Sequence, residues 1–205
     1  KLDNSGNLGI GETSPARLVH IKGTGGGTVA EFENTGTSSY IQFTANSQAD
    51  NAAGYVGYDS NKNMTLWTDD TIGLKIDANG HVTMPKQPAF LANAVGSTTQ
   101  NNIAINTDVK IIFDTEVFDQ NGDFNATSSN ATINGVTTSA YHFCAPVTGK
   151  YFFNGIVRID TIDTAASYYR IKLATSNRTI YGDLHDVGNM FSSDASYHHL
   201  QVTSL

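Results

Sequence analysis

The stretch Lys1-Leu2-Asp3-Asn4-Ser5-Gly6-Asn7-Leu8-Gly9-Ile10 decides the fold, because its pattern returns 74 positions later. The second copy reads Lys75-Ile76-Asp77-Ala78-Asn79-Gly80-His81-Val82-Thr83-Met84. Each copy runs basic, aliphatic, Asp, a two-residue step and Gly, and then continues in alternating apolar residues. Such repetition favours a fibre built from modules laid end to end over a single catalytic globule.

The composition predicts an all-β chain. Of the 205 residues, 39% are hydrophobic, but they alternate with polar residues along the chain and do not cluster. Gly, Asn, Ser and Thr are abundant, whereas Glu occurs only at Glu12, Glu31, Glu33 and Glu116. Helix-favouring residues are therefore scarce, and residues typical of turns and strands are plentiful.

The charge and the lack of long apolar runs exclude two classes of partner. The net charge of −7 and the scattered Lys and Arg residues disfavour nucleic acid, which requires a basic patch. No apolar run approaches the ~20 residues that span a bilayer, so we expect no membrane insertion. Lys1 does not open a signal peptide, and the missing Met suggests a piece of a longer protein.

Residues 1–88 are expected to form a shaft of short strands. Such strands cannot bury enough apolar area alone, so we expect them to intertwine with identical chains. Asn79-Gly80 between two alternating runs is a hairpin signal. The expected strands are Arg17–Ile21, Val29–Phe32, Tyr40–Thr44, Tyr55–Tyr58, Met64–Trp67, Gly73–Ile76 and His81–Met84.

A second domain, residues 89–205, is expected after the connector that contains Pro85 and Pro88, because proline interrupts strands. Residues 121–139 should hold a hairpin or an Ω-like excursion. The expected strands are longer and more aromatic: Ala89–Ala94, Lys110–Asp114, Ala140–Cys144, Lys150–Asp160, Ser167–Ala174, Arg178–Asp183 and Tyr197–Leu205.

The first section resembles bacteriophage tail fibres and related trimeric β-structured shafts. The residues that carry the resemblance are Gly6-Asn7-Leu8-Gly9-Ile10-Gly11-Glu12-Thr13-Ser14-Pro15, where Glu12 stands in place of the family's Thr. Two further runs resemble the strands between such phrases, namely Tyr55-Val56-Gly57-Tyr58-Asp59 and Asn63-Met64-Thr65-Leu66-Trp67-Thr68. The resemblance covers residues 1–84 and implies an intertwined trimeric β shaft.

The second section is similar to the globular head of complement component one, subcomponent q, a trimeric jelly roll related to tumour necrosis factor. The motif is Phe143-Cys144-Ala145-Pro146-Val147-Thr148-Gly149-Lys150-Tyr151-Phe152-Phe153, and Pro88-Ala89-Phe90 resembles the domain's opening. The resemblance implies a jelly-roll β-sandwich head that lacks its final strands. Alternation predicts that Tyr141, Phe143, Tyr151 and Phe153 fill its interior.

Several groups of side chains have the residue types of a functional site, but each has a structural interpretation. Asp119-Gln120-Asn121-Gly122-Asp123 begins like a calcium loop but lacks the rest of the motif, so a turn is expected. His198 and His199 should point to opposite faces of a strand. Cys144 is expected to be a buried thiol. Three pairs of carboxylates are close in sequence but show no pocket context, namely Asp114 with Glu116, Asp160 with Asp163, and Asp183 with Asp186.

We therefore expect no enzymatic activity, no catalytic residue, no cofactor and no metal. The resemblances imply a homotrimeric, extracellular virion protein: a tail fibre that binds a host-surface glycan or protein through its head. Exposed aromatic side chains are suited to sugars, and the candidate receptor contacts are Tyr168, Tyr169, Tyr181 and Tyr197. The alternatives are a fibre that docks onto other virion tail proteins, a secreted complement-like adhesin and a glycan-degrading tailspike.

Overall fold

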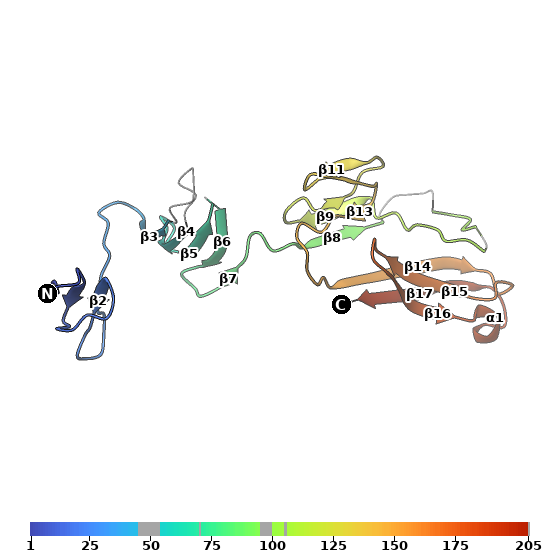
Figure 1. Cartoon of the computed structure of the whole chain (residues 1–205). Coiled ribbons are helices and arrows are strands. Elements are labelled where there is room, and N and C mark those ends of the chain that lie inside the picture. Colours follow the sequence, from blue (N-terminus) through green and yellow to red (C-terminus); the bar gives the residue numbers. More distant parts are fainter. Residues whose placement is uncertain (45–53, 70, 95–99, 105, 205) are drawn as a thin grey trace. The chain divides into compact units, whose positions relative to one another are not determined.

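The computed structural model describes residues 1–44, 54–69, 71–94, 100–104 and 106–204. The described residues are all-β apart from one four-residue helix, α1 (Val187–Met190), which confirms the predicted class. It divides into two compact units, Lys1–Gln87 and Pro88–Leu205 (Figure 1). Among the described residues, no helix has the length and apolar composition that crossing a bilayer would require.

The first unit opens with a parallel strand pair, β1 (Leu8–Ile10) and β2 (Val19–Ile21). Gly9 lies within β1, and glycine permits the close approach of the chain that follows, because a Cβ at this position would lie 2.2 Å from the carbonyl oxygen of Glu12. Glu12, where this chain departs from the tail-fibre phrase, pairs with Lys22 at 2.7 Å. The hydrogen bond from Lys22 lowers the pKa of Glu12 to about 2, so the carboxylate is charged throughout the neutral range.

A five-stranded antiparallel meander follows (Figure 1). Its strands lie in chain order: β3 (Ser39–Phe43), β4 (Gly54–Tyr58), β5 (Met64–Thr68), β6 (Thr71–Ile76) and β7 (Val82–Thr83). On one face Tyr40 packs edge-on against Tyr55 and Trp67, with ring centroids 6.3 and 6.2 Å away. The Trp67 indole donates to the hydroxyl of buried Thr65 at 2.9 Å. These contacts make this the packed face of the sheet.

The opposite face of the meander is apolar, and most of its members are exposed. The register Ile41↔Val56↔Leu66↔Leu74 runs across four strands, and Tyr58↔Met64↔Ile76↔Val82 runs beside it. Residues paired in this way share one side of a sheet. We call this surface the apolar face; its members are Ile41, Phe43, Val56, Tyr58, Met64, Leu66, Leu74, Ile76 and Val82. Phe43, for example, is 62% exposed.

One turn design occurs three times in the first unit. In the first copy, Asp3 accepts hydrogen bonds from the backbone N–H groups of Ser5 and Asn7, and Gly6 has φ 82°. The copy at Asp77 repeats this arrangement with Gly80 at φ 85°. The third copy starts at Asp59 and was not recognised in the sequence, because Lys62 occupies the glycine position. We call these three segments the Asp turns.

The second unit is built from two-stranded antiparallel ribbons. The first is β8 (Phe90–Asn93) with β9 (Thr115–Asp119), and the next two are β10 (Phe124–Asn125) with β13 (His142–Phe143) and β11 (Ala131–Ile133) with β12 (Val136–Thr138). The last two pair β14 (Phe153–Ile162) with β17 (Ala195–Ser204), and β15 (Tyr169–Ala174) with β16 (Thr179–His185). The hairpin expected within residues 121–139 is confirmed, and Asn134-Gly135 is its turn, with φ 52° and 74°.

Aromatic rings form the core around Phe90. Its ring stacks on Phe124 and Phe143 at centroid distances of 4.8 and 5.1 Å, and Phe153 lies 5.3 Å from Phe143. Tyr151 joins at 5.5 Å from Phe143. Three of the four predicted interior aromatics therefore meet. Tyr141 lies under the ammonium group of Lys110 at 5.4 Å, away from this cluster.

Two expected strands are wrong. Residues 110–114 form none, because the side-chain amide of Gln100 bonds both the N–H and the C=O of Ile112, each at 2.9 Å. A side chain thus takes the place of a neighbouring strand. Residues 29–32 are also irregular, and the hydroxyl of Ser39 donates to the carbonyl of Phe32 at 2.8 Å. Cys144 is half-buried, with its thiol 3.7 Å from the carbonyl of Ile133.

Candidate functional site

The structure separates the four candidate tyrosines into different surroundings. Tyr168 lies just before β15 and is 52% exposed, and Arg170 two positions later is also exposed. Tyr169 between them is half-buried and pairs with His185 across the ribbon. Alternation along the strand explains this division, since residues two apart share a side.

A bulge brings Tyr181 to the same side as Arg170. The register of the ribbon is Arg170↔Leu184 at one end but Lys172↔Tyr181 further on, so β16 contains one residue more than β15 between these pairs. In a regular register Tyr181 would pair with Leu173, which is half-buried. The extra residue therefore turns Tyr181 outward, where 60% of it is exposed.

These residues form one surface cluster. The guanidinium carbon of Arg170 lies 4.3 Å from the ring centroid of Tyr181 and 5.8 Å from that of Tyr168. Both distances are within the range of cation–π attraction. We call Tyr168, Arg170 and Tyr181 the Tyr–Arg cluster. Within the part of the chain that the structure describes, no carboxylate forms an ion pair with Arg170.

Tyr197 lies on a different ribbon. It is 62% exposed on the outer face of β17, and its ring lies 6.3 Å from that of His199, edge to face. Further along this face Asn154 accepts hydrogen bonds from the Gln201 amide and the Thr203 hydroxyl, at 2.8 and 3.2 Å. This surface presents the ring of Tyr197 and hydrogen-bonded side-chain amides. Its guanidinium group belongs to Arg158 and is paired with Asp160.

Sequence reasoning missed Arg170, although a signal was present. Tyr168 and Arg170 stand two apart in an expected strand, so their common side follows from alternation alone. The position of Tyr181 had no such signal, because strict alternation across the hairpin gives no indication of a bulge. The placement of Tyr168 beside Arg170 can thus be predicted from the sequence, whereas that of Tyr181 requires the strand register.

The histidines follow the expectation for a strand. His198 is half-buried and His199 is exposed. His198 also meets His185, with the Nε2 of one ring in hydrogen-bond contact with the Nδ1 of the other and ring centroids 4.4 Å apart. The ring centroid of Phe191 lies 5.7 Å from that of His198, in a T-shaped arrangement. Among the described residues, no three His, Cys, Asp or Glu side chains gather closely enough to hold a metal ion.

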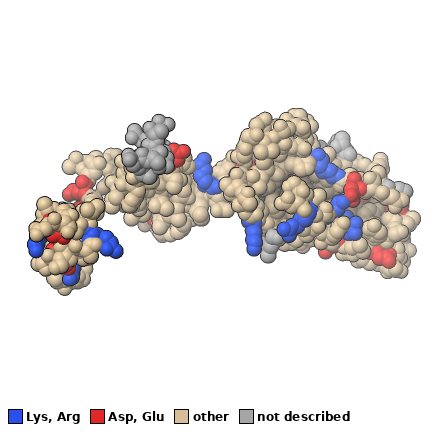
Figure 2. All heavy atoms as spheres, in the orientation of Figure 1, with Lys and Arg blue, Asp and Glu red and all other residues tan. Residues whose placement is uncertain are grey.

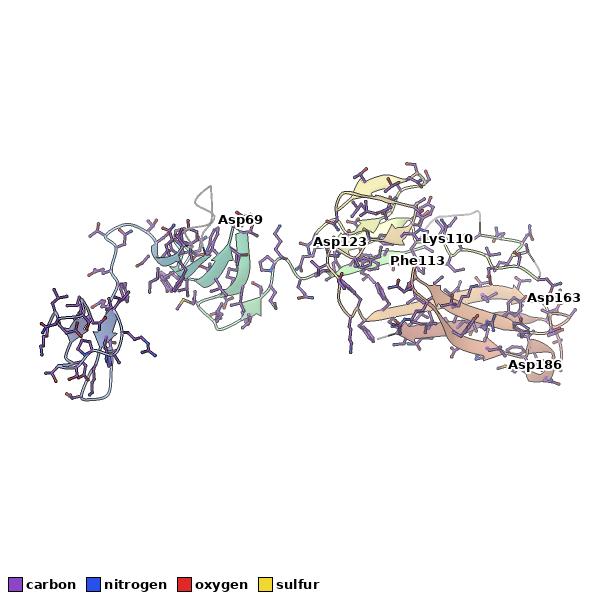
Figure 3. All side chains as sticks on the ribbon, in the orientation of Figure 1. Asp69, Lys110, Phe113, Asp123, Asp163 and Asp186 are labelled. Carbon is purple, nitrogen blue, oxygen red and sulfur yellow. The ribbon has the colours of Figure 1, made fainter. Side chains whose placement is uncertain are left out.

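The candidate carboxylates hold the backbone in place. Asp163 and Asp186 both lie at one end of the β14–β17 and β15–β16 ribbons (Figure 3). Asp163 accepts a hydrogen bond from the N–H of Ala165, and Asp186 caps helix α1 by accepting from Asn189. Asp183 accepts from the N–H of Gln201 at 2.8 Å. Each of these three carboxylates thus accepts a hydrogen bond from a backbone N–H group.

The loop that resembles the start of a calcium site forms a turn, as expected. Asp119 accepts from the N–H groups of Asn121, Gly122 and Phe124. Asp123 is 1% exposed, and its Oδ1 accepts from Asn134 at 2.8 Å. Its Oδ2 is a buried oxygen that has no hydrogen-bond partner among the described residues. Its position beside the β9–β10 region is labelled in Figure 3.

Charged side chains are sparse on the surface. On the face drawn in Figure 2, uncharged residues make up most of the visible surface, and Lys and Arg appear at separate places. This agrees with a charged content of only 15%.

Comparison with protein-family models, curated protein sequences and solved structures returns no match for this chain. Its function is therefore inferred from its own residues and their geometry.

Proposed function

We propose that this chain is part of a homotrimeric bacteriophage tail fibre, in which an intertwined β shaft carries an adhesive jelly-roll head. The observation that carries the proposal is the apolar face of the β3–β7 meander. Residues such as Leu66 and Met64 lie on its central strand and are about half exposed. A continuous apolar surface of this kind on a soluble chain is typical of a protein–protein interface.

The total exposed surface supports association between copies. The chain exposes 14805 Å², whereas a compact protein of 22.0 kDa would expose about 9,300 Å² and two compact halves roughly 11,000 Å². A stable interface buries about 800 Å² on each partner. The excess is large enough for each copy to contact two others, as a trimer requires.

The buried core is correspondingly small. The large apolar side chains buried among the described residues are Phe124, Ile162, Val187, Leu200 and Val202, and all of them belong to the second unit. In the first unit the larger side chains are only partly covered. Burial against identical chains would supply the missing apolar contact, at about 25 cal/mol for each Å² removed from water.

The adhesive part of the proposal rests on the exposed aromatic side chains of the second unit. Tyr168, Tyr181 and Tyr197 each present more than half of their surface. Flat rings with nearby amides are suited to the faces of sugar rings. Three copies of such a surface would raise a modest affinity through multivalency, so a host-surface glycan is the proposed receptor.

Mass measurement in solution tests the assembly. Light scattering on the purified chain should give about 66 kDa, three times 22.0 kDa. Leu66→Lys, in the centre of the apolar face, should reduce that mass, because the charge would be buried at the interface. Gln42→Lys, exposed on the opposite face of the same sheet, should leave it unchanged. A monodisperse species of 22.0 kDa for the unaltered chain would contradict the proposal.

A further inference from the structure

We propose that the Tyr–Arg cluster is a subsite for a carboxylated sugar, so that the receptor of the head is an acidic glycan. This inference rests on the proposed adhesive function and specifies its ligand chemistry. Its physical basis is the exposed guanidinium of Arg170, which lies within cation–π distance of the exposed rings of Tyr168 and Tyr181. The bulge in β16 places Tyr181 on the same side of the ribbon as Arg170.

The charge of Arg170 is available to a ligand. Three other cations of the described chain are paired with carboxylates: Lys22 with Glu12, Arg158 with Asp160, and Lys172 with Asp108. Asp183, the carboxylate closest to the cluster along β16, accepts from the backbone of Gln201 instead. Arg170 forms no ion pair with a carboxylate of the described residues, and two exposed aromatic rings lie within cation–π distance of its guanidinium.

Both rings lie within cation–π distance of the guanidinium. Cation–π contact occurs at the flat face of the guanidinium, and the N–H groups around its edge stay free to donate. A planar carboxylate accepts two of these N–H groups in parallel, which is the strongest arrangement open to one Arg. The cluster thus offers a preformed anchor for an anion at low conformational cost.

The surroundings favour a sugar as the carrier of that carboxylate. Tyr181 and Tyr168 flank the anchor with apolar rings, and Leu184, opposite Arg170 in the register, is 52% exposed. A pyranose ring has apolar C–H faces that pack on such surfaces, while its hydroxyl groups can bond to the two phenol groups. A carboxylate attached to the ring would then reach Arg170 while the ring rests on tyrosine.

The number of cations argues for a carboxylate over a phosphate. A phosphate monoester carries close to two charges at neutral pH and is usually met by several donors or cations. In the cluster one guanidinium is free, because the neighbouring Lys172 is engaged with Asp108. A single planar monoanion therefore matches the site in charge and in shape.

The test uses the full chain and two probes, a hexuronic-acid oligosaccharide and the same oligosaccharide with its carboxyl groups reduced to alcohols. Calorimetry should show that the acidic probe binds at least about tenfold more tightly than the reduced probe, because the free energy of a hydrogen bond to a charged group corresponds to such a difference in affinity. Arg170→Gln should remove the preference for the acidic probe, and Tyr181→Ala should weaken the binding of both probes. Phe152→Ala, which removes a 64% exposed ring outside the cluster, is the matched control and should change the binding of neither probe. Circular dichroism checks that each variant folds, and light scattering checks that it assembles.

The outcomes separate this inference from the proposed function. Equal binding of both probes, or an acidic preference that persists in Arg170→Gln, would overturn the acidic-glycan assignment. Attachment of the labelled chain to host cells would in that case still support adhesion through another surface. A chain that attaches to no host surface and binds neither probe would overturn the adhesive function itself, and the inference with it.

Discussion

Asn63 donates its side-chain amide to both carboxylate oxygens of Asp59, at 3.1 and 2.8 Å. At the equivalent positions Asn7 donates its amide to one oxygen of Asp3, at 3.1 Å, and the Nδ1 of His81 lies 2.9 Å from one oxygen of Asp77. The backbone closes each turn in the same manner, with the N–H of Asp59 donating to the carbonyl of Asn63 at 2.9 Å. The hairpin between β4 and β5 is therefore built to the same plan as the repeated phrase that opens the chain.

Replacement of Lys62 by glycine should stabilise the first unit. Lys62 has φ 64°, a left-handed conformation that costs a residue with a Cβ roughly 1–2 kcal/mol, whereas Gly adopts it freely. After the entropy that Gly loses on folding is subtracted, Lys62→Gly should raise the free energy of unfolding by about 0.5–1 kcal/mol. Chemical denaturation measures this change.

Two controls accompany that variant. Lys62→Ala removes the charge but keeps the Cβ, so it should not stabilise the chain. Ser60→Gly places glycine in the same turn at a position without positive φ and should lower the stability. Stabilisation by Lys62→Ala equal to that by Lys62→Gly would show that charge, and not backbone conformation, is responsible.

The Asp turns should make the first unit sensitive to acid. Hydrogen bonds to the ionised form lower the pKa of Asp59, chiefly from the Asn63 side chain, and those of Asp3 and Asp77, chiefly from the backbone N–H of Asn7 and of His81. A carboxyl whose pKa is lower in the folded state stabilises the fold above its unfolded pKa and loses that effect as pH falls through the folded one.

The thermal midpoint of the first unit should therefore stay level near neutrality and fall progressively below about pH 5. Circular dichroism across this range provides the measurement. Asp59→Asn cannot ionise, so this variant should begin less stable and show a shallower decline in acid. A decline as steep as that of the unaltered chain would rule out a contribution from Asp59.

Substitution of Gly182 should disrupt the contact between β16 and β17. A Cβ at this position would lie 2.3 Å from the carbonyl oxygen of Gln201 and 2.8 Å from the Cα of Val202, so backbone would have to move. Gly182→Ala should cost about 2 kcal/mol or more in unfolding free energy. Gly149→Ala is the control, because its nearest atom would lie 3.7 Å away, in Tyr151. Equal stability of the two variants would contradict this packing.

The aromatic core of the second unit should depend on Phe90. Phe90→Ala removes the ring between Phe124 and Phe143 and should cost about 3 kcal/mol. Phe152→Ala, which removes a ring that is 64% exposed, should change stability far less in the isolated chain. Urea denaturation compares the two. A loss for Phe152→Ala as large as that for Phe90→Ala would place the core elsewhere.

Local patterns in the sequence predicted most strands and the direction of their side chains. Tyr40 and Ile41 lie on opposite faces as alternation requires, and Asn134-Gly135 forms a tight turn inside the segment expected to contain a hairpin. The interior aromatics near Phe143 were also identified, since every second residue of a strand faces the same way. These are relationships between residues a few positions apart.

Relationships over longer separations were not predicted. Gln100 prevents a strand at Ile112 from twelve positions away, and no local pattern marks a side chain that will bond to a distant backbone. The turn at Asp59 was hidden because Lys62 tolerates a conformation that usually signals glycine. The outward direction of Tyr181 depends on a single unpaired residue, which composition and periodicity do not reveal.

That unpaired residue of β16 also has an evolutionary consequence. Insertion of one residue into β15 between Arg170 and Lys172 would restore a regular ladder and place Tyr181 on the side of the ribbon opposite to Arg170, without any change in the chemical character of the strand. Deletion of that residue would return the ring to the side of Arg170. Ligand preference could thus be gained or lost through a change in length, a kind of variation that comparison of residue identities at aligned positions would record only as a gap.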